Sequence, residues 1–260
     1  MSRFIDKLKR LSRTETQPMG FRTAQPVSTE HKMQLVASLA QESNESLIDY
    51  VAEADAGLLR ISKLGSGAKA LQKISEDVSD IPWGGWLQDG SVGEIKQMIK
   101  AGCDFLVFQA ARTPLAILQN DEVGKILEVE ISLSEGLLRA ANELPIDAVL
   151  VKGEQSDGYS LTWQHLMTFQ RLATLVTKPL LVSIPSRVTP GELQALWETG
   201  VDSVVVEVTV GQSKDRLRKI RRVIDKLVYP LPRRDERIKP MLPYISTATG
   251  TLITEEEEEE

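Results

Sequence analysis

The stretch IDAVLVKG, residues 146–153, decides how the rest of the chain is interpreted. It is a short apolar run that ends on Lys152 and then Gly153. A continuous apolar run of this length, bounded by a turn residue, is typical of a parallel strand that is buried on both faces. We therefore predict a buried strand here, with Lys152 delivered to its carboxyl end, where ligands bind in parallel α/β folds.

Seven other short apolar runs resemble this stretch in length and flanking residues, and a helical pattern follows each strand. The predicted strands cover residues 34–40, 57–62, 82–88, 104–110, 126–132, 146–153, 179–185 and 202–208. Helix starts are marked by capping boxes at Ser91 and Thr189, by an N-cap at Asn44, and by first-position prolines such as Pro114. The helix after Pro114 must be short, because few residues remain before the fifth strand.

Strand and helix alternating eight times is the pattern of a single (βα)₈ TIM barrel, which is our predicted fold. The alternative is an open doubly wound sheet. That fold needs a glycine-rich fingerprint after its first strand, and residues 40–44 provide none.

Three regions follow along the chain. Residues 1–30 form a basic amphipathic segment and an irregular connector, and residues 31–228 form the barrel. Residues 229–260 contain four prolines and end in six glutamates, so we expect an irregular C-terminal extension with a disordered acidic tail.

Residues 1–14 place Phe4, Ile5, Leu8 and Leu11 on one helical face, with basic side chains on the rest. Such a helix can lie on an anionic membrane or in the groove of a partner protein. It can also pack on the body, for example by capping the bottom of the barrel. Four apolar residues give weak membrane affinity, which favours packing.

The composition of the chain argues against several classes of function. The chain has 42% hydrophobic and 26% charged residues, and its net charge of −6 comes from the terminal glutamate run, without which it carries 31 charges of each sign. The chain therefore has no net positive charge that would favour binding to nucleic acid. With one cysteine, Cys103, the chain cannot form an intrachain disulfide, and with two histidines, His31 and His165, a metal site is unexpected. We find neither a membrane-spanning run nor a secretory signal, and expect a cytoplasmic protein.

Strand parity selects the side chains that could carry chemistry. Outward positions pack under helices and are apolar, so the charged residues that alternate with them face the interior. This rule places Glu128 and Glu130 of the fifth strand, Glu207 of the eighth, Lys152 of the sixth and Arg60 of the second in one interior. Buried charges are costly unless they pair. A Lys152–Glu130 ion pair without chemistry is therefore one interpretation, and a reactive centre is the other.

The stretch KPLLVSIPSRVTPGELQALWETGVDSVVVEV, residues 178–208, resembles the last two units of aldolase-type, phosphate-binding barrels. These families have a strand, a Thr-Pro helix start, a helix ending near Gly-Val-Asp and a final apolar strand. The resemblance covers about a quarter of the chain closely and the rest by layout. It implies a lysine on strand six that forms a Schiff base, here Lys152, with Glu130 as a proton shuttle.

The chain departs from that family at its phosphate-binding glycines. It has IPSR at residues 184–187 and EVTVG at residues 207–211, where the family usually carries Gly-Gly and Gly-Ser. Arg187 and the amides near residues 212–213 are expected to hold an anion instead. Gln109 and Ser183 complete the set of predicted anion-binding and substrate-binding side chains with Arg60.

Two functional hypotheses follow. The first is a small-molecule enzyme of lyase or isomerase type that acts on an anionic, optionally phosphorylated carbonyl substrate. Lys152, Glu130 and Glu207 would be catalytic, and neither a cofactor nor a metal is expected. The second is a non-catalytic barrel that acts as a scaffold or peripheral membrane protein through residues 1–14.

Overall fold

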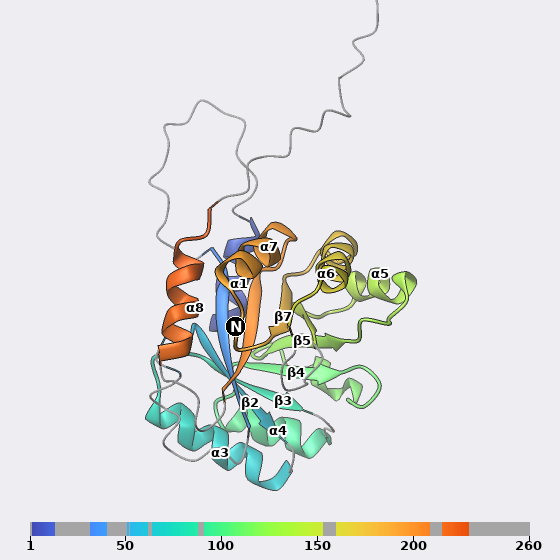
Figure 1. Ribbon diagram of the computed structural model, residues 1–260. Helices are drawn as coiled ribbons and strands as arrows, with labels where there is room; N and C mark the ends of the chain where they lie inside the picture. Colours follow the sequence, from blue (N-terminus) through green and yellow to red (C-terminus); the bar gives the residue numbers. More distant parts are fainter. Residues whose placement is uncertain are drawn as a thin grey trace, which may run out of the picture. The chain divides into compact units, whose positions relative to one another are not determined.

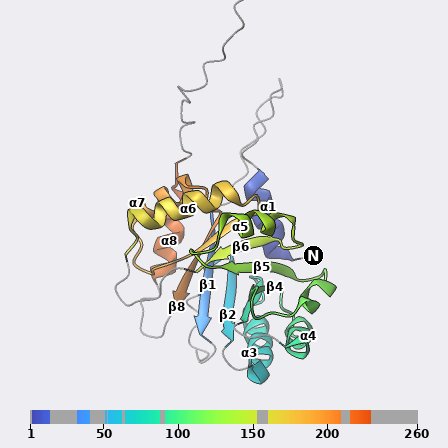
Figure 2. The same cartoon turned by 90° about the vertical axis from the view of Figure 1, so that its right-hand side faces the viewer.

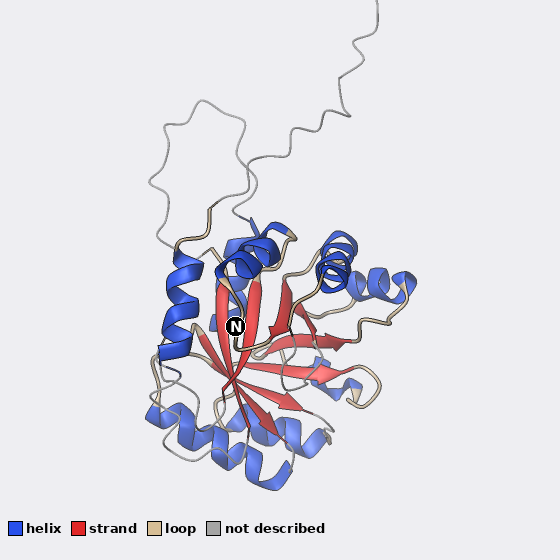
Figure 3. Ribbon diagram, in the orientation of Figure 1, coloured by secondary structure: helices blue, strands red, loops and turns tan. Residues whose placement is uncertain are grey.

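A computed structural model describes residues 2–13, 32–40, 51, 53–61, 64–87, 91–152, 160–208 and 215–228. The chain divides into two compact units, Met1–Val228 and Tyr229–Glu260, and the second lies outside the described residues, as does the predicted N-cap at Asn44. Within the described residues, eight strands pair in parallel and in sequence order, and the last pairs with the first. The predicted (βα)₈ barrel is thus confirmed, with strands inside and helices around them (Figures 1 and 3).

The elements lie close to their predicted positions, with one exception discussed below. The strands are β1 (Gln34–Ala40), β2 (Ala56–Ile61), β3 (Trp83–Leu87), β4 (Phe105–Gln109), β5 (Gly124–Val129), β6 (Ala148–Val151), β7 (Leu180–Ile184) and β8 (Ser203–Val208). The helices are α1 (Arg3–Arg13), α3 (Leu64–Asp77), α4 (Val92–Lys100), η2 (Leu115–Gln119), α5 (Glu135–Glu143), α6 (Trp163–Leu175), α7 (Pro190–Glu198) and α8 (Asp215–Asp225). None of the helices in this part of the chain is long and apolar enough to span a membrane.

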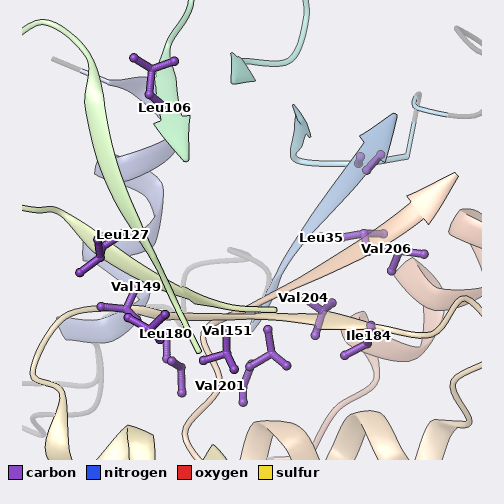
Figure 4. Close-up of a cluster of buried hydrophobic side chains, with 14 of the residues drawn as sticks. Leu35, Leu106, Leu127, Val149, Val151, Leu180, Ile184, Val201, Val204 and Val206 are labelled. Atoms are coloured by element: carbon purple, nitrogen blue, oxygen red, sulfur yellow. The ribbon is translucent and has the colours of Figure 1, made fainter. Parts of the chain in front are cut away.

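Two apolar layers follow from the alternation of side chains along each strand. Residues such as Leu127, Val204 and Val206 belong to the layer between the strands and the helices (Figure 4). Their sequence neighbours, such as Ile126 and Val205, belong to a second layer inside the barrel, which we call the lumen. The predicted strand parity is confirmed by this division.

The start of α7 is as the sequence predicts, whereas Pro114 is the N-cap of η2 and not its first helical residue. Thr189 and Glu192 form a reciprocal capping box at α7, with Pro190 at the first helical position. The segment after Pro114 is the short 3₁₀ helix η2, because too few residues separate β4 from β5 for a longer helix.

Helix α1 closes the lumen at the amino-terminal end of the strands, away from the arrowheads of β1, β2 and β8 (Figure 2). Phe4, Ile5 and Leu8 are buried in the lumen cluster, and the Phe4 and Phe105 ring centroids are 4.6 Å apart. The apolar face of the amphipathic segment is therefore used inside the protein. This is the packed alternative for residues 1–14.

Two aspartates hold α1 in place. The carboxylate of Asp104 accepts hydrogen bonds from Ser2 Oγ at 2.7 Å and from the backbone N–H groups of Arg3 and Phe4. An acidic group at a helix amino terminus satisfies its orphan N–H groups and complements its dipole. Further along α1, Lys9 Nζ donates to Asp147 Oδ1 at 2.6 Å. The helix is docked by polar as well as apolar contacts.

Strand β5 is the exception. The prediction was residues 126–132, but the strand covers Gly124–Val129. In the sequence, Lys125 suggests that the strand starts after it, because lysine side chains are rarely buried. In the structure the Lys125 side chain is buried, and its Nζ lies 3.3 Å from Asp121 Oδ1. The strand also ends earlier than predicted, at Val129, so Glu130 lies just past it.

Candidate functional site

The carboxyl ends of the strands bring Arg60, Trp86 and Glu207 together. Arg60 comes from β2, and its guanidinium lies 4.7 Å from the ring centroid of Trp86 on the neighbouring strand β3. Its Nη1 is 3.7 Å from Oε1 of Glu207 on β8. The Arg60 side chain is 17% exposed and that of Glu207 is 39% exposed. A partly desolvated cation is thus held between an aromatic face and a more accessible carboxylate.

Glu128 of β5 extends this group across the lumen. Trp86 Nε1 donates to its Oε2 at 2.6 Å, and Gln109 Nε2 donates to its Oε1 at 3.0 Å. Glu128 is buried, and burial of a carboxylate is tolerated when both oxygens are hydrogen-bonded. These bonds fix the plane of the Trp86 ring and, through it, the position of the Arg60 guanidinium.

The result is a continuous set of contacts that we call the rim cluster: Glu207, Arg60, Trp86, Glu128 and Gln109. It contains a cation suited to an anionic ligand, a carboxylate accessible enough to exchange protons with a ligand, and a flat apolar surface. Together these groups can bind and polarise a small anionic molecule.

Several predicted site residues lie in this region. Arg60, Gln109 and Glu207 face the lumen as parity predicts and belong to the rim cluster. Ser183 is half-buried on the lumen face of β7, next to Val205 of β8 in the strand register. Their roles as binding or catalytic residues stay predictions.

Lys152 and Glu130 do not form the predicted pair. Lys152 lies one residue past β6 and is exposed, and Glu130 is exposed past β5 with its Oε2 accepting from Ser132 Oγ at 3.3 Å. Among the described residues no hydrogen bond or ion pair links Lys152 to Glu130. The expected ion pair inside the lumen is therefore absent from this part of the structure, because both strands end before these residues.

Arg187 is exposed in the turn after β7, and its neighbour Ser186 accepts a hydrogen bond from Arg216 Nη1 at 2.9 Å. The amides near residues 212–213, which were expected to complete an anion site with Arg187, lie outside the described residues.

Sequence reasoning underestimated two members of the rim cluster. Parity placed Glu128 in the lumen without a partner. The sequence around Trp86 allows a surface on which a ligand ring stacks, but it favours a residue that fills the lumen or the underside. The signal that could have joined them is that Arg60, Trp86 and Glu128 all occupy lumen-facing positions near the carboxyl ends of their strands. A polar residue at the equivalent position of β1, Ser38, was missed altogether.

Other chemistry-bearing residues have structural surroundings. Cys103 is buried before β4, and burial raises the pKa of its thiol from 9.0 to about 12. His165 lies in the first turn of α6, where its Nδ1 accepts from the backbone N–H of Thr162 at 3.0 Å. Within the described residues, no group of three or more His, Cys, Asp or Glu side chains is arranged to hold a metal ion.

Comparisons with known proteins bear on the fold. No family model and no curated protein matches the sequence. Among solved structures, the chain is similar to a mutant tryptophan synthase alpha-subunit from Pyrococcus furiosus, with a TM-score of 0.58 and 11% identity over 75% of this chain and 97% of that one. A structure described as native KDPGal gives a TM-score of 0.55 and 13% identity over 80% and 96%. The likeness confirms the (βα)₈ barrel fold.

Proposed function

We propose that this barrel is a small-molecule enzyme of lyase or isomerase type that acts on an anionic carbonyl substrate at the carboxyl ends of its strands. The observation that carries the proposal is the Arg60 guanidinium, which is held over Trp86 beside Glu207. In barrels of this fold, the active site is built at this end of the strands. Support also comes from the comparison, because one similar structure is a subunit of tryptophan synthase.

Arg60 binds the anionic group of the substrate in this proposal. A guanidinium presents paired N–H groups that match the two oxygens of a carboxylate or phosphate. The Trp86 face fixes the guanidinium plane before the substrate arrives, which lowers the entropic cost of binding.

Glu207 performs the acid–base step. A substrate held by Arg60 lies beside this carboxylate, which can take a proton from the carbon next to the carbonyl group. The pair of electrons left behind is delocalised onto the carbonyl oxygen, and in this proposal Gln109 and Ser183 donate hydrogen bonds to that oxygen. Return of the proton to a neighbouring carbon gives isomerisation. Loss of a hydroxyl group from the next carbon as water, with the proton returned by Glu207, gives a lyase reaction.

Lys152 provides the covalent version of the same proposal. It would form a Schiff base with the substrate carbonyl, with Glu130 moving the proton. Its place just past β6 is at the correct end of the barrel, and a phosphorylated substrate would involve Arg187.

Proton exchange tests the acid–base version. The protein is incubated in D₂O with a panel of small anionic carbonyl compounds, with and without a phosphate group, and exchange at carbon is followed by ¹H NMR. We expect one compound to exchange, with a rate reduced by about 10²–10⁴-fold in Glu207→Gln and a clear loss in Arg60→Met. Lys96→Met, at an exposed position of α4, is the matched control. Exchange that is unaffected by Glu207→Gln, or absent across the panel, contradicts the proposal.

Borohydride reduction tests the covalent version. The same compounds are incubated with the protein, reduced and mapped by mass spectrometry of the peptides. A label on Lys152 supports a Schiff base there. Labelling elsewhere, or none, removes the Schiff base and leaves Glu207 as the acid–base residue.

A further inference from the structure

Ser38 is a buried polar residue without a hydrogen-bond partner in the part of the chain that the structure describes. It lies on β1 between Ala37 and Leu39, which belong to the outer apolar layer, so its side chain faces the lumen. The residue is 1% exposed, and its Oγ bonds to no group in the described part of the chain. The strand register places Leu58 on one side of Ser38 and Glu207 on the other.

An unpartnered buried hydroxyl destabilises a protein by about 1–3 kcal/mol, and alanine would fit the same position without that cost. Retaining a serine directly beside Glu207, on the face that also carries Arg60, is explained if a ligand supplies the missing partner. Glu207 itself does not bond to the hydroxyl, although it is the adjacent residue across the sheet.

The Arg60–Glu207 pair determines which ligand reaches Ser38. Arg60 Nη1 and Glu207 Oε1 are 3.7 Å apart. A charge-assisted hydrogen bond between such groups measures about 2.7–2.9 Å, so this contact is weaker than a direct hydrogen bond. A ligand carboxylate can therefore take the place of the Glu207 carboxylate on Arg60. The exchange leaves one carboxylate in contact with Arg60, and the displaced Glu207 stays on β8 next to Ser38, beside the bound ligand.

We propose that Ser38 binds the oxygen substituent of a small carboxylate whose neighbouring carbon carries a hydroxyl or carbonyl group, while Arg60 binds the carboxylate in place of Glu207. This inference rests on the proposed function and specifies its substrate class. Among the described residues of the rim cluster, two carboxylates, Glu128 and Glu207, accompany one guanidinium. This balance favours a monoanionic carboxylate over a phosphate dianion, because like charges repel in a partly buried site.

Two matched ligands isolate the contribution of Ser38. Glycolate and acetate differ by one hydroxyl group, and both are titrated into ¹⁵N-tryptophan-labelled protein while the Trp86 indole N–H signal is followed. This signal is assigned with Trp86→Phe. We expect glycolate to bind about five- to tenfold more tightly than acetate. In Ser38→Ala the two should bind equally, and in Arg60→Met neither should bind.

Thermal unfolding distinguishes ligand recognition from a structural role of Ser38. If the hydroxyl serves a ligand, Ser38→Ala should keep or raise the melting temperature of the free protein. If it is structural, the melting temperature should fall while the preference for glycolate persists, which overturns the inference.

Replacement of Glu207 by a ligand carboxylate on Arg60 can be tested separately. Glu207→Gln removes the competing anion from Arg60, so acetate should bind more tightly to this variant than to the unmodified protein. Weaker acetate binding contradicts the exchange.

The failure of this inference differs from the failure of the proposed function. Glycolate and acetate that bind equally, in an Arg60-dependent manner, refute the role of Ser38 and leave the anion site intact. Binding that survives Arg60→Met, or no response of Trp86 to either ligand, refutes the anion site and the role of Ser38 together.

Discussion

Gly84 on β3 lies against the ring of Phe105, and its lack of a side chain leaves room for that ring. A Cβ built there would lie 2.3–2.5 Å from the ring of Phe105, the ring that packs against Phe4 of α1. We expect Gly84→Ala to lower the free energy of unfolding by about 1–3 kcal/mol, because a buried aromatic ring would have to move. Urea denaturation measures this change.

The matched control is Gly136→Ala in α5, where no atom lies within 4 Å of the added Cβ. Alanine is a better helix former than glycine, so this variant should keep or increase stability by about 0.5–1 kcal/mol. Equal effects of the two substitutions would contradict the steric explanation.

Cys103 provides a prediction with a defined pH dependence. Burial raises the pKa of its thiol from 9.0 to about 12, so at pH 8 only about one folded molecule in 10,000 carries the thiolate. We expect thiol reagents to modify Cys103 only after unfolding in guanidinium. Rapid modification of the folded protein at pH 8 would contradict this burial.

The same pKa shift affects stability. The thiol of the unfolded chain ionises near pH 9, whereas the folded one stays protonated to about pH 12. Its contribution to stability is therefore complete below pH 9 and decreases as the pH rises toward 12. Cys103→Ala should show a smaller loss of stability over this interval, which denaturation at several pH values would measure.

Residue-level reasoning located much of the rim cluster and failed where strands end. Alternation alone places Arg60, Gln109 and Glu207 on one face, because apolar neighbours must cover the helices. It could not fix the end of β5 within two residues, since a buried Lys125 looks like a boundary. Glu130 and Lys152 therefore lie past their strands instead of inside the lumen.

At the scale of the element, α1 determines how the amino-terminal end of the barrel is closed. We expect Phe4→Ala to lower the free energy of unfolding by about 3 kcal/mol, because it leaves a cavity next to Phe105. Lys7→Ala, at an exposed position on the same helix, is the control and should have little effect. Similar destabilisation by both would contradict the docking of α1.

Liposome flotation tests the proposed membrane contact of residues 1–14. The chain with and without these residues is mixed with vesicles containing anionic lipid. With the apolar face of α1 buried, we expect no flotation of either form. Flotation that depends on residues 1–14 would instead support a peripheral membrane role.

The elements themselves were largely predictable because each has a local physical cause. Capping residues set the starts of α6 and α7, and apolar runs set the strands. The docking of α1 on the strand starts was only one of several alternatives, since a stripe of four apolar residues does not specify what it packs against.

At the scale of the whole molecule, an aspartate precedes each even-numbered strand. Asp55, Asp147 and Asp202 accept hydrogen bonds from the backbone N–H groups of Leu35, Lys125 and Leu180 at the starts of β1, β5 and β7. Asp104, before β4, accepts from the amino terminus of α1 instead. Three of these aspartates thus join pairs of strands, and two of the four, Asp104 and Asp147, bond to the closing helix α1.

Hydrogen exchange distinguishes these two uses. We expect Asp202→Ala to increase exchange of the Leu180 amide and to leave α1 protected. Asp104→Ala should increase exchange of the first α1 amides and leave Leu180 protected. Increased exchange throughout the barrel in both variants would show that the two aspartates do not act locally.

The seal that Phe4, Ile5 and Leu8 form beneath the strands has a kinetic consequence. In the described part of the chain, α1 closes this end of the lumen, so a reactant and the species made from it would both use the carboxyl ends of the strands to reach and leave the rim cluster. Under the proposed function, accumulated product therefore competes with incoming reactant, and initial-rate measurements with added product should show purely competitive inhibition.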